Sequence, residues 1–281
     1  MNYRHIYHAG NFADVFKHAV LARILAYLRQ KDAPFRVLDT HGGIGLYDLS
    51  SEAAEKTGEW RDGIGRLDGE LPPALAGFLA PYLEAVAAIR AGAPGAVYPG
   101  SPLIIRHHLR PGDGLTATEL HPDDVATLKR CFEFDRQAKV IELDGWLALK
   151  SFLPFRERRG LVLIDPPFEA TDEFAAMARG LVEAQARAAT LTYMLWYPVK
   201  DHAGVGRFVN TIAGLGIRKI LRAELAIAAP GQLPGLSASG LIVINPPWTL
   251  HDELQAALPL LAVRLARAPG AAARVEWLVG E

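Results

Sequence analysis

The feature that most constrains the fold of this chain is its alternation of short apolar runs with segments of helical pattern. Such alternation is typical of a parallel β-sheet with helices wound on both faces. The predicted strands lie at 35–39, 114–119, 138–142, 161–165, 190–197, 217–225 and 241–245, and the predicted helices between them lie at 14–30, 122–135, 172–189, 202–215 and 250–266. Only a turn-rich segment joins the last two strands, which predicts an antiparallel hairpin at the edge of the sheet.

One stretch interrupts this alternation. Between Asp48 and about Arg110 no strand pattern is convincing, while 51–67 and 71–92 have helical patterns. We therefore predict two parts: a Rossmann-like domain formed by residues 1–47 and 111–281, and a helical insertion subdomain at 48–110.

Composition favours a globular protein, because half of the 281 residues are apolar and can form one large core. The net charge of −1 argues mildly against a nucleic-acid partner, since phosphate contacts usually need a basic surface. The single cysteine excludes an internal disulfide and a cysteine-based zinc site, which fits a reducing cytoplasm. The longest apolar candidate for a membrane span, 19–28, is short and contains Arg23. We expect a cytoplasmic protein without a membrane anchor.

The segment 160–168 ends an apolar run with Asp165, two prolines and Phe168. An exocyclic amine such as adenine N6 is a poor nucleophile, because its lone pair is delocalised into the ring. Two acceptors for its N–H hydrogens turn that lone pair outward. Asp165 and the Pro166 carbonyl can supply both, and Phe168 can stack on the base. The segment is similar to the Asp/Asn/Ser-Pro-Pro-aromatic motif of amino-group methyltransferases that use S-adenosylmethionine.

The chain has a second copy of this pattern, Asn245-Pro-Pro-Trp248, and either copy could be a plain strand ending in a proline turn. Ligands of open α/β sheets bind beyond the carboxyl ends of the strands. The first four predicted strands end at a glycine-rich loop (42–45), Glu119, Asp144 and Asp165. Singly, the glycines fit a turn and Asp144 fits a helix cap. In this order they match an S-adenosylmethionine site, so we predict Asp165 as catalytic and Asn245 as a strand terminator.

Eight segments in matching order then resemble the RlmJ family of adenine N6-methyltransferases of bacterial 23S rRNA. They are YRHIYHAGNFADVFKH, DTHGGIG, YPGSPLI, TELHP, RRGLVLIDPPF, LWYPV, GIRKILRAEL and SGLIVINPPW, and they extend through essentially the whole chain. The resemblance implies a class I, Rossmann-like methyltransferase with a seven-stranded, mostly parallel sheet and a small helical insertion after the first strand. We expect S-adenosylmethionine as cofactor, 23S rRNA as partner, a monomer, and no metal.

The resemblance also implies roles for single residues. The implied catalytic residues are Asp165, Pro166 and Phe168. The implied cofactor-binding residues are Lys17, His18, His41, Gly43, Ser101, Glu119, Asp144, Gly145 and Asp165. Tyr3 and Phe168 are implied to contact the RNA. Lys17, His18 and His41 would surround the methionine end of the donor, where N–H groups suit a carboxylate. Ser101 could instead be a helix N-cap, because proline follows it.

Phe168 stands where the family usually has tyrosine, and a glycine follows His41 where alanine is common. Stacking needs the ring rather than the hydroxyl, so we expect activity to survive. Among basic residues, Arg4, Lys17, Arg106 and Arg110 are expected near the pocket mouth, and Arg156, Arg158 and Arg159 at the opposite edge. The alternatives are a methyltransferase acting on DNA adenine or protein glutamine, and a non-catalytic RNA-binding assembly factor.

Overall fold

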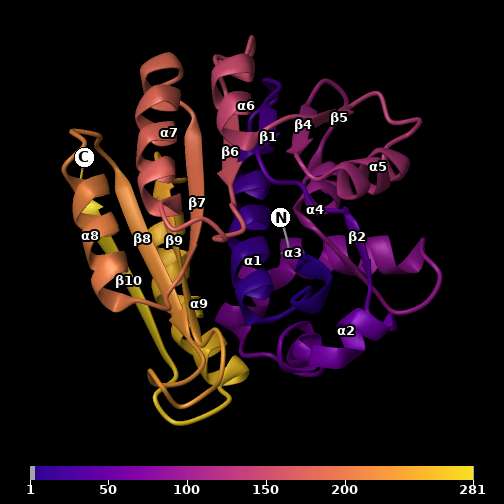
Figure 1. Ribbon diagram of the computed structural model, residues 1–281, viewed down its shortest axis with the longest axis vertical. Coiled ribbons are helices and arrows are strands. Elements are labelled where there is room, and N and C mark those ends of the chain that lie inside the picture. The colour runs from indigo at the N-terminus through magenta and orange to yellow at the C-terminus, as the bar shows by residue number, and fades with distance from the viewer. Residues whose placement is uncertain (1–3, 281) are drawn as a thin grey trace.

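A computed structural model describes residues 4–280 of the chain (Figure 1). Its centre is an eight-stranded sheet in the order β10-β8-β9-β7-β6-β1-β4-β5. The strands are β1 (Arg36–Asp39), β4 (Gly114–Glu119), β5 (Ala138–Glu142), β6 (Gly160–Ile164), β7 (Thr192–Pro198), β8 (Ile220–Ala226), β9 (Ala238–Ile244) and β10 (Ala272–Val279). The five strands from β5 to β7 pair in parallel, and β9, β8 and β10 continue the sheet by antiparallel pairing.

Helices cover both faces of this sheet (Figure 1). The core of one face includes residues of α1 (Phe12–Leu28), α3 (Pro73–Ala91), α4 (Ser101–His108), α5 (Pro122–Cys131) and α9 (Leu250–Leu265). The core of the other face includes residues of α6 (Gly145–Phe152), α7 (Glu173–Arg187) and α8 (His202–Ala213). The remaining elements are α2 (Glu52–Thr57), the 3-10 turns His5–Tyr7, Glu59–Asp62 and Ile64–Leu67, and a two-stranded antiparallel sheet of β2 (Leu46–Asp48) and β3 (Val97–Pro99).

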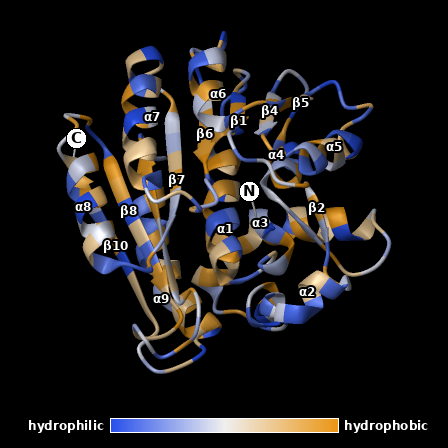
Figure 2. Cartoon of the chain, viewed as in Figure 1, coloured by the Kyte–Doolittle hydropathy of each residue, from blue (hydrophilic) through white to orange (hydrophobic). Residues whose placement is uncertain are grey.

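Strand β6 explains why an uninterrupted apolar run forms the centre of the sheet. Successive side chains of a strand point to opposite faces. Leu161 and Leu163 belong to the core shared with α1, whereas Val162 and Ile164 belong to the core shared with α6 and α7. Every residue of β6 is buried, and the strand is hydrophobic along its length (Figure 2). Asp165, the next residue, therefore lies at the carboxyl end of a central strand.

The predicted Rossmann-like fold class is confirmed, but the sheet has eight strands rather than seven. The additional strand β10 lies in an Ala/Arg/Gly-rich stretch without a strong strand pattern, and it forms by pairing with β8. The predicted β8–β9 hairpin is present, although β10 rather than the hairpin occupies the edge. The helices α4 and α6 were not among the predicted elements, because each spans only eight residues.

The segment 48–110 contains strand β3 as well as helices, and β2 and β3 pair across its two ends. Helix α3 of this segment contacts α1, α4 and α9 and contributes to their common core. The division into a domain and an insertion subdomain stays a prediction.

The expectation that 19–28 is the longest apolar candidate for a membrane span is wrong, because helix α3 is longer. Within residues 4–280 it is the one helix that is long and apolar enough, by length and composition, to cross a membrane. Leu75, Leu79 and Tyr82 on its inner face are fully buried in the core. Much of its apolar character therefore serves packing in this fold.

Asn245 lies far from Asp165 along the strands. Because β9 runs antiparallel to β7, the end of β9 lies beside the start of β7. The Asn245 side chain donates from Nδ2 to the carbonyls of Ala189 (2.8 Å) and Leu191 (3.0 Å). Its φ of 49° is in the left-handed region. The second Pro-Pro copy thus ends a strand at the amino ends of the parallel strands, opposite the pocket.

We predict that Asn245→Ala lowers the free energy of unfolding by about 1–3 kcal/mol, because two carbonyls lose their donor and alanine disfavours this φ. Asn245→Gly loses the same hydrogen bonds but adopts the backbone conformation readily, so its loss should be smaller. Urea unfolding followed by tryptophan fluorescence measures both. A glycine variant less stable than the alanine variant would contradict the backbone argument.

Candidate active site

The main cavity lies where the strand order of the sheet reverses. Strand β1 pairs with β4 on one side and with β6 on the other, and ligands of such sheets bind beyond the carboxyl ends at this point. The cavity has a volume of about 420 Å³. The loops that follow β1, β4, β5, β6 and β7 line it, together with the first turns of α1.

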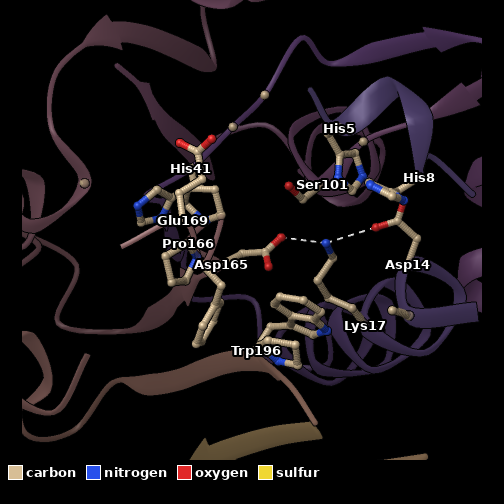
Figure 3. A pocket seen from close by; sticks show the side chains of 18 of the residues that line it. His5, His8, Asp14, Lys17, His41, Ser101, Asp165, Pro166, Glu169 and Trp196 are labelled. Atoms are coloured by element: carbon tan, nitrogen blue, oxygen red, sulfur yellow. Dashed lines mark hydrogen bonds and ion pairs between the residues drawn. The ribbon is translucent and has the colours of Figure 1, made fainter. Parts of the chain in front are cut away.

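A buried lysine links α1 to the loop after β6 (Figure 3). Lys17 Nζ lies 2.5 Å from Asp165 Oδ2 and 3.0 Å from Asp14 Oδ1. Asp14 precedes Lys17 by one helical turn, so both side chains lie on the same side of α1. Asp14 Oδ2 also accepts from Gly10 N and contacts His5 Nε2, each at 2.9 Å. These contacts leave Asp165 Oδ1 without a hydrogen-bond partner among the described residues.

The charges in this cluster support one another. Burial alone would lower the pKa of Lys17, but Asp165 and Asp14 outweigh it and raise that pKa. Burial alone would raise the pKa of Asp14, but His5 and Lys17 hold it well below its ordinary value. Lys17 therefore stays cationic and Asp14 anionic over the physiological range.

The loop after Asp165 presents an aromatic ring to the cavity. Pro166 is buried, and Phe168 has a φ of 53°, which residues other than glycine rarely adopt. The Phe168 ring meets Phe174 and Trp196 edge-to-face, with centroid distances of 5.1 Å and 5.8 Å. These contacts hold the ring in the cavity wall.

Glu119 is held by backbone N–H groups at the end of β4. Its Oε2 accepts from Gly43 N at 2.9 Å, and its Oε1 accepts from Leu120 N and His121 N at 2.8 Å and 2.9 Å. Gly43 has a φ of 61°, and a Cβ there would lie 2.3 Å from the Tyr47 hydroxyl. Glycine is therefore favoured where the loop after β1 reaches this carboxylate, chiefly because of its φ.

Asp144 begins α6 as its N-cap. Its Oδ1 accepts from Trp146 N (3.0 Å) and Leu147 N (2.9 Å), while no residue in the described part of the chain bonds its Oδ2. The helix-cap alternative is therefore observed, and one oxygen is still available to a ligand. A Cβ on Gly145 would lie 2.6 Å from the Thr40 carbonyl, so glycine allows α6 to approach the loop after β1.

The two predicted histidines of the cavity are both neutral. Burial lowers the pKa of His18 to about 3 and that of His41 to about 4. His18 Nδ1 lies 2.7 Å from the Tyr98 hydroxyl, and His41 Nδ1 lies 2.8 Å from Thr40 Oγ. Ser101 is buried as the first residue of α4, whose N-cap is Gly100. The helix-cap alternative for Ser101 is therefore wrong.

The structure brings the predicted site residues together around this one cavity. Those that line it are Lys17, His18, His41, Gly43, Ser101, Glu119, Asp144, Gly145, Asp165, Pro166 and Phe168. Their individual roles stay predictions, and Tyr3 lies outside the described residues. The analysis of the sequence missed Asp14 and Trp196. The spacing of Asp14 and Lys17 on one helix could have identified the first, whereas Trp196 needed the tertiary packing.

The expected position of two arginines, near the pocket mouth, is wrong. Arg110 donates to the carbonyls of Arg29 (3.0 Å) and Lys31 (2.9 Å), which precede β1 and lie at the edge of the sheet opposite the cavity. Arg106 pairs with Asp135, just before β5 and so at the same far edge. Arg4 instead lies near the cavity mouth, 3.6 Å from Asp124, which lines the cavity.

The chain is similar to several known proteins. The family model described as "Ribosomal RNA large subunit methyltransferase D, RlmJ" matches residues 32–279. The ribosomal RNA large subunit methyltransferases J of Escherichia coli and Haemophilus influenzae are 44% and 42% identical, each over the full length of both chains. A crystal structure of a Legionella pneumophila protein is 34% identical, with a TM-score of 0.85, and covers 96% of this chain and 98% of its own.

Asp39, the last residue of β1, provides a pH test of the site. It is fully buried, and this burial raises its pKa to about 7. The folded protein then binds this proton more tightly than the unfolded chain. Asp39 therefore costs stability as the pH rises from the unfolded pKa near 4 to about 7, by at most about 1.4 kcal/mol per pH unit.

We predict that Asp39→Asn removes this cost. Urea unfolding at pH values from 5 to 8 should show the stability advantage of the variant growing with pH. Parallel stability curves for the variant and the native protein would contradict the assignment.

Proposed function

Because the chain belongs to the RlmJ family of large-subunit ribosomal RNA methyltransferases, we propose that it methylates N6 of an adenine in 23S rRNA, with S-adenosylmethionine as methyl donor and N6-methyladenosine as product. The observation that supports this proposal most strongly is the Asp165-Pro-Pro-Phe168 loop. It opens into the cavity at the switch point of the sheet. Lys17 holds one Asp165 oxygen, and the other has no hydrogen-bond partner within residues 4–280.

The cavity suits the proposed donor. When bound, S-adenosylmethionine supplies an electrophilic methyl group on a positively charged sulfonium. Glu119, fixed by three backbone N–H groups, would accept from the ribose hydroxyls, and Asp144 Oδ2 would accept from the adenine amine. Lys17, with one N–H beyond its two carboxylates, would meet the methionine carboxylate together with His18.

In the proposed reaction, Asp165 Oδ1 and the Pro166 carbonyl accept the two N6 hydrogens of the target adenine. The N6 lone pair then points at the methyl group, and the new N–C bond forms as the S–C bond breaks. Asp165 is placed to accept the proton that N6 loses. Lys17 limits the motion of the Asp165 carboxylate, so the chain contributes chiefly alignment and charge placement.

The target adenine would be turned out of its RNA stack. Unstacking costs about a few kcal/mol, and stacking on the Phe168 ring returns about 1–3 kcal/mol. Lys200 is exposed just after β7 and lines the cavity, where its charge suits an RNA phosphate. We further propose a cytoplasmic monomer that needs no metal, with Tyr3 on the RNA side.

One experiment separates this proposal from its rivals. Purified protein is incubated with labelled S-adenosylmethionine and, in parallel, unmodified 23S rRNA, DNA containing adenine, and a glutamine-containing protein substrate. Label recovered as N6-methyladenosine from the rRNA supports the proposal. Label on DNA or glutamine supports the other methyltransferases, and S-adenosylmethionine binding without transfer supports an assembly factor.

We predict that Asp165→Asn lowers the rate of methyl transfer by about two to three orders of magnitude at saturating donor and RNA, because an acceptor used most strongly in the transition state becomes a poorer one. The matched control is Asn245→Ala in the second Pro-Pro copy, whose folded fraction should keep its activity. An active Asp165 variant beside a folded, inactive Asn245 variant would reverse the assignment of the catalytic loop.

A second prediction concerns donor affinity. Glu119→Ala should weaken S-adenosylmethionine binding by about 1–3 kcal/mol in calorimetry, because ribose hydroxyls lose their acceptor. Glu142 pairs with Glu119 across β4 and β5 and is exposed, so Glu142→Ala is the matched control and should bind normally. Unchanged affinity in a folded Glu119 variant would refute the assignment.

A further inference from the structure

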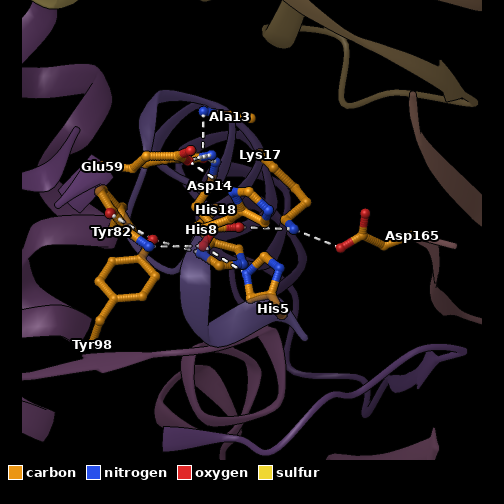
Figure 4. Close-up of polar contacts among 12 residues, drawn as sticks. His5, His8, Ala13, Asp14, Lys17, His18, Glu59, Tyr82, Tyr98 and Asp165 are labelled. Atoms are coloured by element: carbon orange, nitrogen blue, oxygen red, sulfur yellow. Dashed lines mark hydrogen bonds and ion pairs between the residues drawn. The ribbon is translucent and has the colours of Figure 1, made fainter. Parts of the chain in front are cut away.

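A chain of buried hydrogen bonds runs behind the cavity from His18 into the segment 48–110 (Figure 4). His18 Nδ1 lies 2.7 Å from the Tyr98 hydroxyl, which lies 3.0 Å from the Tyr82 hydroxyl. Tyr98 belongs to β3 and Tyr82 to α3, and both are fully buried. His18 is 1% exposed, but its ring lines the cavity. Two tyrosines distant in sequence thus support one cavity residue from behind.

The number of hydroxyl protons decides the direction in which these hydrogen bonds are donated. Each hydroxyl has one hydrogen, and within residues 4–280 the Tyr82 hydroxyl has only Tyr98 as a partner. If Tyr82 donates to Tyr98 and Tyr98 donates to His18 Nδ1, every hydroxyl proton is bonded. In the reverse direction the Tyr82 proton is buried without an acceptor, which is unfavourable. The first direction is therefore preferred.

This direction decides which His18 nitrogen carries its proton. The buried ring is neutral, since burial depresses its pKa, so it has one N–H hydrogen. With Nδ1 accepting from Tyr98, that hydrogen is on Nε2. Nε2 is the ring nitrogen without a protein partner in the described part of the chain, so it is the atom available to a molecule in the cavity.

We propose that Tyr98, supported by Tyr82, is a positioning residue that holds His18 in the Nε2–H tautomer, so that this N–H donates to the carboxylate at the methionine end of the methyl donor. The inference rests on the proposed function, because it concerns how the donor is held. It gives the two tyrosines of the segment 48–110 an indirect part in donor binding, through His18.

Binding of two related ligands tests the proposal. S-adenosylhomocysteine has the amino-acid end, whereas 5′-methylthioadenosine lacks it. Tyr98→Phe should weaken S-adenosylhomocysteine binding by about tenfold, the effect of one lost hydrogen bond, and leave methylthioadenosine binding unchanged. Tyr82→Phe should give a smaller change in the same direction. Calorimetry with each purified full-length variant measures both ligands.

The matched control is Tyr193→Phe. Tyr193 is also buried, but its hydroxyl donates to the carbonyls of Ala184 and Ala188 in the other core. It should leave the ratio of the two affinities unchanged. Equal weakening of both ligands by Tyr98→Phe, or of neither, would overturn the inference alone. Native protein that binds neither ligand would overturn the proposed function, and the inference with it.

A spectroscopic test does not depend on any variant of the tyrosines. Long-range proton–nitrogen NMR of the native protein with labelled histidine reports which ring nitrogen is protonated, and loss of one signal set in His18→Gln assigns His18. The Nε2–H pattern is expected for the native protein, with a mixture of tautomers in Tyr98→Phe. An Nδ1–H pattern in the native protein would overturn the proposal.

Discussion

The buried ion cluster of Lys17 with Asp14 and Asp165 is the interaction on which the arrangement of the site depends. An ammonium group in a protein interior is tolerated only when carboxylates and hydrogen bonds replace the water that it loses. Lys17 is 4% exposed and has a carboxylate on each side. Because one carboxylate belongs to α1 and the other follows β6, the cluster joins the first helix to the loop that is predicted to be catalytic.

The cluster extends to the N-terminal segment. Asp14 accepts from Gly10 N and contacts His5, so the turn before α1 is tied to the same charge. Removing one member would leave another charge buried without its partner, which is far more costly than the loss of a surface ion pair. The N-terminal turn, α1 and the loop after β6 therefore behave as one structural unit around the cavity.

The charge of the cavity explains how a nearly neutral protein can suit a nucleic-acid substrate. Its lining includes the carboxylates Asp14, Glu59, Glu119, Asp124, Asp144, Asp165, Glu169 and Glu173. Such a lining favours a cationic donor and an uncharged base, and it disfavours phosphate inside the cavity. RNA phosphates would therefore be bound at the rim, by side chains such as Lys200 and Arg4, so no strongly basic net charge is needed.

The sequence by itself determined the fold class, seven of the eight strands of the main sheet and the order of the site residues, because apolar periodicity and strand-end residues are local properties of the chain. It also distinguished Asp165 from Asn245, since strand order decides which loop lies at the centre. Tertiary structure alone decided that β10 completes the sheet, that Arg106 and Arg110 lie away from the cavity, and that Lys17 bonds Asp165. It also brought Tyr98 and Tyr82 behind His18. The side-chain contacts join residues that are 29 to 148 positions apart in the sequence, and β10 has only a weak strand pattern of its own. Only the packing of the folded chain brings such segments together.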